Sequence, residues 1–451
     1  MITIFLGISL AAALYIISSI IANIIKSKKI GFAFSNAFLV ILFFLFMLTI
    51  TNNYFGLHLD SMLSMNSFSV FMALTVTLGM ILIHFIAYGE EHYLEFSLFS
   101  GFSFFGMLLV IMSTNIIVLF LGLEALAIPM VMMLLLSNKW LEAGIKYFVV
   151  VIVSAGLFAF GAAVLFIFGG NLQIINHNNI GDTIAMLFFV VSLGIESGLF
   201  PFNLWIPDVY QGGPSFVTAM LGGINKKVGI VALIYILLIV FPYMSQNLLL
   251  FFAVLTMIYG NLAALPQKNV KRMLAYSSIS QVGYILIGLA TISRYGLAAS
   301  IFQIFAHMFA FIGVFAIVGA LESKERTEIK DYIGLNNENK IMAFALSLFL
   351  FSMMGVPFTI GFVGKFMLFS SAVYSNFVWL AVLGIIATLI SVYYYAKVII
   401  AVYTNKANAR HVNMRLSLYF VIFVSMIIVV LFGVFPSAII SLAQAAAQNI
   451  I

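Results

Sequence analysis

The chain has 451 residues, of which 64% are hydrophobic and only 8% are charged, whereas about a quarter of the residues of an ordinary soluble domain carry a charge. This composition excludes a soluble domain and predicts an all-α polytopic membrane protein. The net charge of +6 is spread over short loops, which argues against a nucleic-acid partner. The absence of cysteine excludes disulfides and cysteine-ligated zinc or iron–sulfur sites. The six histidines are scattered along the sequence and form no metal-ligand cluster.

Apolar runs of about twenty residues, the length that crosses the hydrocarbon core of a bilayer, follow one another along the chain. They predict about fourteen membrane-spanning helices. Their approximate ranges are Ile4–Ile25, Phe34–Ile50, Phe68–Ala87, Phe96–Met112, Asn115–Leu136, Ala143–Phe168, Thr183–Tyr210, Phe216–Val240, Asn247–Leu265, Tyr276–Ile292, Leu297–Leu321, Ile341–Val373, Phe377–Val402 and Leu416–Ile440. The seventh and twelfth runs are overlong and contain proline, so we expect each to be a broken helix.

Basic residues give the orientation of these spans, because loops rich in lysine and arginine stay in the cytoplasm. The even-numbered loops carry only Arg294. The odd-numbered loops one, five, nine, eleven and thirteen carry Lys26, Lys28, Lys29, Lys139, Lys268, Lys271, Arg272, Lys324, Arg326, Lys330, Lys340, Lys406, Arg410 and Arg415. We expect the odd loops to be cytoplasmic, both termini to lie on the opposite side, and these loop residues to serve topology alone.

Ionised side chains within apolar spans are rare and are commonly retained for function. Glu124 lies in the fifth span shortly before Pro129, whose missing N–H should bend the helix just past the carboxyl group. Lys146, on the next span, is the candidate partner of Glu124. The pair could take part in proton transfer or could be a structural ion pair that holds two helices together.

Two adjacent lysines, Lys226 and Lys227, lie in the eighth span. Thr218, Gly222 and Lys226 follow an i, i+4 spacing, so one helix face is expected to carry small residues that lead to the ammonium group of Lys226. Lys227 points about 100° away from Lys226 and is expected to face a neighbouring helix or water. Desolvated lysines titrate readily, which suits a proton carrier.

The eleventh span contains His307, whose side chain titrates nearest to neutral pH; it could belong to a proton relay or be an ordinary core residue. In the twelfth span, Gly355, Pro357 and Gly361 are expected to unwind the helix. Lys365 follows Gly361 by four residues and should lie on the same helix face.

The two broken spans, with Pro201 in the seventh and Pro357 in the twelfth, form a pair. Paired interrupted helices are the sequence pattern of transporters built from repeats. Because the two spans are an odd number of crossings apart, consecutive five-helix units would be inverted relative to one another. We expect one transmembrane domain, 1–451, with N-terminal helices over 1–95, a first repeat over 96–240, an inverted second repeat over 247–402 and a C-terminal helix over 416–440.

Four segments carry a resemblance to a known family: PFNLWIPDVYQGGPSFVTAML from Pro201, KYFVVVIVSAGLFAFG from Lys146, LGLEAL around Glu124 and GVPFTIGFVGKFMLF around Lys365. They closely resemble the antiporter-like subunit N of respiratory complex I, the NADH-quinone oxidoreductase family, and the similarity covers roughly spans four to thirteen. The PDVYQG and KYF segments resemble subunit N more than its paralogues L and M or the cation/proton antiporter subunits.

The resemblance implies a fourteen-helix membrane-arm subunit with two inverted five-helix repeats and no cofactor of its own, any quinone, iron–sulfur clusters and flavin belonging to other subunits. In the family, a glutamate on helix five, lysines on helices seven and eight, and a lysine or glutamate on helix twelve line a polar axis for proton translocation. By motif, these positions are Glu124 on helix five, Lys226 on helix eight with Lys227 as the register alternative, and Lys365 on helix twelve. At helix seven, where the family usually has lysine five residues before the proline of the PF motif, this chain has Glu196.

Glu196 inverts the local charge that the family pattern implies. A lysine there would pair with Glu124, whereas Glu196 would repel it, so one carboxylate should hold a proton unless Lys146 or Lys226 intervenes. We expect Glu196 to remain in the relay as a neutral acid and to form a salt bridge with Lys226. A degraded or altered channel is the alternative.

Three functions remain in competition. The first is a proton-translocating subunit of a quinone-reducing oxidoreductase, without a redox centre in this chain, in which protons move through Glu124, Lys146, Glu196, Lys226, Lys227, His307 and Lys365. The second is a subunit of a cation/proton antiporter or of a membrane-bound hydrogenase, and the third is a non-conducting scaffold. The expected partners are paralogous membrane-arm subunits and lipid in a prokaryotic cytoplasmic membrane. The sequence leaves open whether H⁺ or Na⁺ moves and which electron donor and quinone the parent complex uses.

Overall fold

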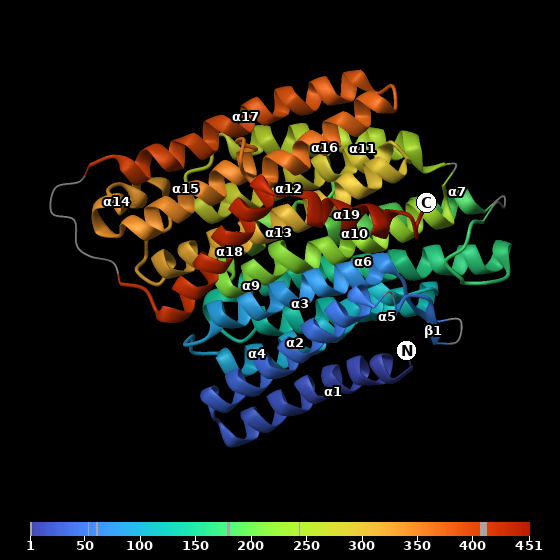
Figure 1. The fold of residues 1–451 in the computed structure, drawn as a ribbon, viewed down its shortest axis with the longest axis horizontal. Coiled ribbons are helices and arrows are strands. Elements are labelled where there is room, and N and C mark those ends of the chain that lie inside the picture. Colours follow the sequence, from blue (N-terminus) through green and yellow to red (C-terminus); the bar gives the residue numbers. More distant parts are fainter. Residues whose placement is uncertain (1, 53, 60–61, 178–180, 243, 406–412) are drawn as a thin grey trace. The chain divides into compact units, whose positions relative to one another are not determined.

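The computed structural model describes residues 2–52, 54–59, 62–177, 181–242, 244–405 and 413–451. Lys406 and Arg410, which we expect in loop thirteen, lie outside the described residues. The described chain is mostly helical (Figure 1). A short antiparallel hairpin of β1 (Leu57–Leu59) and β2 (Leu63–Met65) interrupts the helices.

The helices follow one another with short connections. The α-helices are α1 (Ile2–Ile25), α2 (Lys28–Thr51), α3 (Ser67–Ala87), α4 (Tyr93–Met112), α5 (Ile116–Leu134), α6 (Leu141–Gly169), α7 (Asp182–Ser197), α8 (Trp205–Gly212), α9 (Ser215–Met220), α10 (Lys226–Ile234), α11 (Ser245–Ala264), α12 (Val270–Ala290), α13 (Arg294–Glu322), α14 (Leu335–Glu338), α15 (Lys340–Met354), α16 (Ile360–Tyr374), α17 (Val378–Tyr403), α18 (Leu416–Val434) and α19 (Ser437–Ala447). The 3₁₀ helices are η1 (Asn138–Trp140) and η4 (Ile329–Tyr332), and the π-helical segments are η2 (Leu221–Asn225) and η3 (Tyr235–Val240).

Twelve helical segments of the described chain are long and apolar enough to cross a membrane. They confirm the all-α, multi-pass membrane fold. The pairs α7 with α8 and α15 with α16 occupy the places of the seventh and twelfth expected spans, and each member of a pair is too short to be counted by itself. About fourteen crossings, and the inverted repeats, therefore stay predictions.

The break in the seventh span falls where proline and glycine predict it. Helix α7 ends at Ser197, and Gly198 adopts a left-handed conformation with φ of 83°, which costs glycine little. Pro201 lies in the irregular segment before α8 begins at Trp205.

The break in the twelfth span has a well-defined helix cap. Gly355 has φ of 91°, and the N–H groups of Gly355 and Val356 both donate to the carbonyl of Phe351 at 3.0 Å. This left-handed cap closes α15, and Pro357 follows two residues later, where a helix cannot continue. The expected helix breaks at Pro201 and Pro357 are therefore confirmed.

The chain forms two compact units. The first comprises Met1–Ser197, Ile224–Ser245 and Leu442–Ile451, and the second comprises Gly198–Gly223 and Gln246–Ser441.

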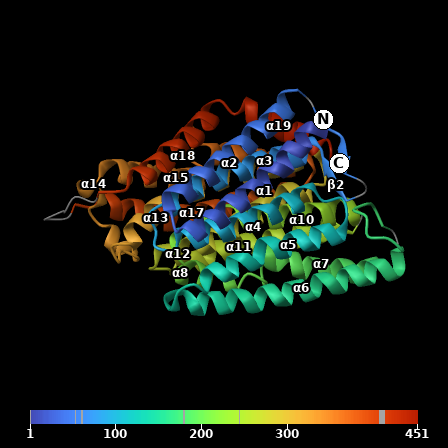
Figure 2. The ribbon, with the colours of Figure 1, turned by 90° about the horizontal axis from the view of Figure 1, so that it is seen from below.

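In the first unit, α4 packs on α5, α6 on α7, and α7 on α10; Figure 2 shows α6 beside α7. Glycines let the backbones of α4 and α5 approach closely. A Cβ atom on Gly106 would lie 2.5 Å from the backbone nitrogen of Leu126, and one on Gly122 would lie 2.8 Å from that of Val110. In a membrane the lipid tails are as apolar as the side chains, so the hydrophobic effect does not drive helices together. Close van der Waals packing at small residues stabilises their association instead.

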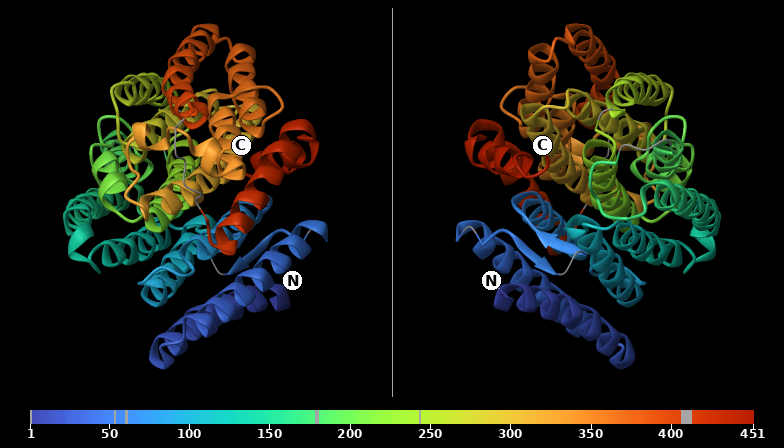
Figure 3. Two further views of the ribbon diagram at one scale, coloured as in Figure 1. Left: turned by 90° about the vertical axis from the view of Figure 1, so that its left-hand side faces the viewer. Right: turned by 90° about the vertical axis from the view of Figure 1, so that its right-hand side faces the viewer.

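Among the described membrane-spanning helices that lie wholly in the second unit, α12 and α13 are the most buried. Helix α13 contacts α12, α15, α16 and α18, and Figure 3 shows α16 and α17 as neighbouring orange helices. The halves of the second broken helix thus lie against the centre of this unit, where buried polar groups can be held in place.

The eighth expected span is helical from Ser215 to Val240, but it is not a uniform α-helix. The segment η2 precedes the two lysines and η3 follows them. A π turn closes with i to i+5 hydrogen bonds. The i, i+4 spacing that places Thr218 and Lys226 on one face therefore does not hold through residues 221–225.

Candidate functional site

Glu196 lies in the last turn of α7, two residues before the helix break. Its carboxyl group interacts with the side chain of Ser154 on α6. The same Ser154 hydroxyl donates to the carbonyl of Ser192 at 3.0 Å, and the Ser192 hydroxyl donates to the carbonyl of Ser154 at 2.8 Å. Two serines thus join α6 to α7 and supply Glu196 with a polar neighbour in an apolar setting.

Glu124 lies on α5 and is half-buried. It is close enough to Glu196 for the two carboxyl groups to interact electrostatically. The structure therefore brings together the two acidic residues that the sequence places on the fifth and seventh spans. The expected salt bridge between Glu196 and Lys226 stays a prediction.

Lys146 lies near the start of α6, where its ammonium group forms an ion pair with Glu142 at 2.7 Å, one turn earlier. Its side chain is 42% exposed and that of Glu142 is 83% exposed. Lys146 therefore differs from the other candidate residues, because both its side chain and that of its partner Glu142 are exposed on the surface of this chain. Its role in proton transfer stays a prediction.

Lys226 and Lys227 begin α10 and are both fully buried in the first unit. The two ammonium groups interact electrostatically. Among the described residues, the Nζ atom of Lys227 has no hydrogen-bond partner. Burial of a lysine without a hydrogen bond is costly, so its retention indicates a task beyond packing.

Lys365 lies on α16 of the second unit and is 3% exposed. Its ammonium group donates a hydrogen bond of 3.0 Å to the carbonyl of Met354, the last residue of α15. The unpaired carbonyls at a helix C-terminus carry partial negative charge and favour a cation. Lys365 thus spans the break, because it belongs to one half of the broken helix and binds the end of the other.

His307 lies on α13, 3% exposed, with its ring 5.4 Å from that of Phe311. Two buried glutamines connect its surroundings with the broken helix. Gln303, one turn before His307, donates to Gln281 on α12 at 3.0 Å, and Gln281 donates to the carbonyl of Met353 at 3.2 Å. His307, Gln303, Gln281 and Met353 line one cavity that is too tight for a water molecule in this conformation.

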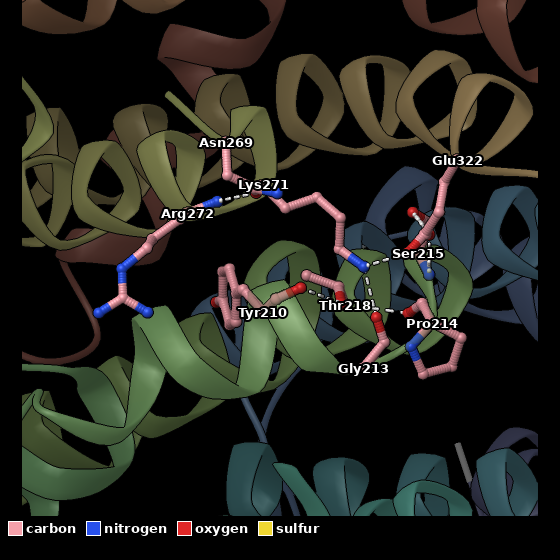
Figure 4. A network of polar contacts seen from close by, with 9 residues as sticks. All are labelled: Tyr210, Gly213, Pro214, Ser215, Thr218, Asn269, Lys271, Arg272 and Glu322. Carbon is pink, nitrogen blue, oxygen red and sulfur yellow. Dashed lines mark hydrogen bonds and ion pairs between the residues drawn. The ribbon is translucent and has the colours of Figure 1, made fainter. Parts of the chain in front are cut away.

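A second polar cluster surrounds the corner between α8 and α9 (Figure 4). The buried ammonium group of Lys271 donates to the carbonyl of Gly213, after the end of α8, and to the carboxylate of Glu322 at 2.8 Å. The backbone N–H and the hydroxyl of Ser215, at the start of α9, both donate to Glu322. The ammonium group of Lys271 thus binds at the C-terminal end of α8, and the carboxylate of Glu322 binds at the N-terminal end of α9, as the helix dipoles favour.

This cluster corrects the expectation that the basic residues near loop nine serve topology alone. Lys271 and Arg272 lie in the first turn of α12, and Lys271 is only 2% exposed. Arg272 forms an ion pair of 2.6 Å with Asp208 on α8. Both side chains hold the region after the first helix break.

Comparisons with known proteins place the chain. Residues 113–391 match the family described as NADH:quinone oxidoreductase/Mrp antiporter, TM. A NADH-quinone oxidoreductase subunit N from Trichlorobacter lovleyi is 35% identical over 369 residues, which cover 77% of this chain and 76% of that protein. The chain belongs to the NADH-quinone oxidoreductase subunit N family. The resemblance expected from the PDVYQG, KYF, LGLEAL and GVPF segments is confirmed.

Solved structures share the fold of this subunit N family member. A chain of respiratory complex I from Thermus thermophilus aligns with a TM-score of 0.85 and 23% identity, over 97% of this chain and 99% of that chain. A chain of the Mrp complex from Dietzia sp. DQ12-45-1b aligns with a TM-score of 0.90 and 17% identity, over 98% and 97%. At such identities the likeness shows the fold alone, so membership of subunit N rests on the sequence relatives.

Sequence reasoning about this subunit N family member missed several polar residues that the structure places beside the candidate site. Gln281, Gln303 and Tyr284 lie on α12 and α13 among apolar neighbours and are buried. The two amides were visible as polar groups inside apolar spans, which is the signal that could have found them. Lys271 was missed because a lysine at the end of an apolar run reads as a loop residue.

Proposed function

We propose that the chain is a proton-translocating membrane-arm subunit of a complex I-like quinone oxidoreductase. In this function, quinone reduction on other subunits drives protons through ionisable groups of this chain: Glu124, Lys146, Glu196, Lys226, Lys227, His307 and Lys365. The relatives are named as subunits of an oxidoreductase. This chain contributes proton transfer and holds no redox centre of its own.

One observation supports this proposal most strongly: each broken helix carries an ionisable group at its break. Glu196 stands two residues before Gly198, and Lys365 binds the carbonyl end of α15. Broken helices at which charged groups meet free backbone ends are how membrane transporters build ion sites. A scaffold without conduction has no need of such groups, which are expensive to bury.

The proposed surroundings follow from the same function. The partners are other membrane-arm subunits, including paralogous antiporter-like ones, and the bilayer. The location is a prokaryotic cytoplasmic membrane, with the odd-numbered loops in the cytoplasm and both termini on the other side. Residues 96–240 and 247–402 form the two inverted repeats in this proposal.

The first test is purification of the affinity-tagged chain in a mild detergent, followed by mass spectrometry of the proteins that accompany it. Iron–sulfur and quinone-site subunits in the sample support a redox-driven pump. A sample that holds only cofactor-free membrane subunits would instead assign the chain to a cation/proton antiporter.

The second test measures proton uptake by the purified complex in liposomes while it reduces quinone. Lys365→Ala should lower proton uptake per quinone reduced without loss of any subunit from the complex. Lys330→Gln, which removes only an exposed ion pair with Glu328, is the control and should behave like the wild type. Unchanged uptake in Lys365→Ala would overturn conduction through this residue.

A further inference from the structure

The ammonium group of Lys365 has a second neighbour besides the carbonyl of Met354. It lies 4.4 Å from the centre of the Tyr284 ring, over the ring face. Tyr284 is fully buried and Lys365 is 3% exposed. A cation over an aromatic face in a desolvated site is stabilised by the negative charge density of the ring.

The Tyr284 ring is itself fixed in place. Its hydroxyl accepts hydrogen bonds from the amide of Asn261 at 3.1 Å and from the hydroxyl of Thr388 at 3.3 Å. The hydroxyl of Tyr394 donates to Asn261 at 2.9 Å and so orients that amide. Three helices, α11, α12 and α17, therefore hold one ring whose face meets the lysine.

The backbone around the lysine leaves it little room to move. A Cβ atom on Gly355 would lie 3.1 Å from the side chain of Lys365, and one on Gly364 would lie 2.0 Å from Gln303. The aliphatic part of the Lys365 side chain thus packs against the backbone of Gly355 at the helix break. The ring on one side and the helix end on the other define the position of the charge.

Resting on the function proposed above, we propose that Tyr284 is a positioning residue for proton transfer through Lys365. The ring holds the ammonium group at the carbonyl end of α15, where the lysine bridges both halves of the broken helix. The hydroxyl acts only through Asn261 and Thr388, which fix the ring; it does not carry the proton. The aromatic face is therefore required, and the hydroxyl is of secondary importance.

The test compares Tyr284→Phe with Tyr284→Met in the complete complex, by redox-driven proton uptake in liposomes. Phenylalanine keeps the ring face and should stay within about two-fold of the wild type, whereas methionine fills similar space without a ring and should lower uptake about ten-fold. Equal uptake by the two variants would overturn the proposal. Equal and strong losses in both would show that the hydroxyl, not the ring, matters, and would overturn it as well.

A graded substitution keeps the test decisive if Tyr284→Met does not assemble. Fluorinated phenylalanines at position 284 withdraw charge from the ring face while they keep its shape, so uptake should fall stepwise as fluorine atoms are added. A flat response would contradict the proposal. Lys365→Ala distinguishes failure of the proposed function from failure of the role of Tyr284. If Lys365→Ala leaves proton uptake unchanged, the proposed function of this site is wrong. If Lys365→Ala loses uptake but the fluorinated series shows no change, only the role of Tyr284 is wrong.

Discussion

Gly229 on α10 lies against Glu196 on α7, so closely that a Cβ atom on Gly229 would be 3.2 Å from the carbonyl carbon of Glu196 and 3.3 Å from its Cβ. This contact lies within one helical turn of the lysine pair that begins α10. Because Gly229 has no side chain, α10 can approach α7 closely at Glu196. The position of Glu196 is therefore set by backbone packing as well as by Ser154.

We expect Glu196→Gln to abolish redox-driven proton uptake and to leave the complex assembled. The glutamine keeps the size of the side chain and its polar contact with Ser154 but cannot take up or release a proton. Proton uptake in liposomes and subunit composition on a native gel measure the two properties. A normal ratio of protons to electrons in this variant would remove Glu196 from the relay.

Lys226→Ala and Lys227→Ala distinguish the two adjacent lysines. Because the residue that carries protons must change its charge during turnover, its loss should stop redox-driven uptake, and we expect this for Lys226→Ala. Lys227→Ala should retain more uptake, because the family motif assigns the helix-eight lysine to Lys226 and leaves Lys227 as the register alternative. The reverse order of activities would assign the role to Lys227.

Gly361→Ala should destabilise the complex strongly. A Cβ atom there would lie 1.9 Å from the carbonyl oxygen of Ser352, so α16 must move away from the end of α15, at a cost of about 3 kcal/mol. Gly156→Ala is the matched control, because a Cβ at that position meets nothing within 4 Å. Thermal unfolding of the purified complex compares the two; equal midpoints would disprove the close contact.

Lys271→Met should lower stability by about 2 kcal/mol, because it leaves Glu322 and the carbonyl of Gly213 without their cation. The double variant Lys271→Met, Glu322→Met should recover part of this loss, since no lone charge remains. Lys330→Met serves as control, because its ion pair with Glu328 is solvent-exposed and should contribute nothing measurable. Thermal unfolding without any recovery in the double variant would show that the two residues act independently.

The natural chain has no cysteine, so single cysteines report topology without background labelling. Lys139→Cys and Arg294→Cys place a thiol at two exposed positions, one within η1 in loop five and one at the start of α13. We expect a membrane-impermeant maleimide to label position 294 in intact cells and position 139 only after lysis. The opposite pattern would invert the proposed orientation.

Much of this fold could be predicted from apolar runs and breakers. The breaks in the seventh and twelfth spans follow from Pro201 and Pro357 with nearby glycines, because proline lacks the N–H that a helix needs and glycine adopts the left-handed conformation that closes one. Helix ends were harder. The tenth expected span starts at Tyr276, yet α12 starts at Val270, since Lys271 and Arg272 find partners that let them enter the helix.

The candidate site could be predicted in its ionisable residues but not in their partners. Glu124, Lys226 and Lys365 stand out because charge is rare in apolar spans. Their neighbours come from helices far apart in sequence: Tyr284 reaches Lys365 only because α12 packs on α16. The π-helical segments could not be predicted from the sequence either, because a single i, i+5 turn gives no periodic pattern in so short a segment.

The segment η2 stands directly before Lys226. A π turn holds one residue more than an α turn of the same helix, so it marks a place where the length of the chain can change. Removal of one residue from 221–225 would convert the segment to an α-helix and leave Lys226 facing as it does. The same removal inside α10 would turn every later side chain by about 100°. We therefore expect the loss of one residue to be better tolerated within 221–225 than inside α10.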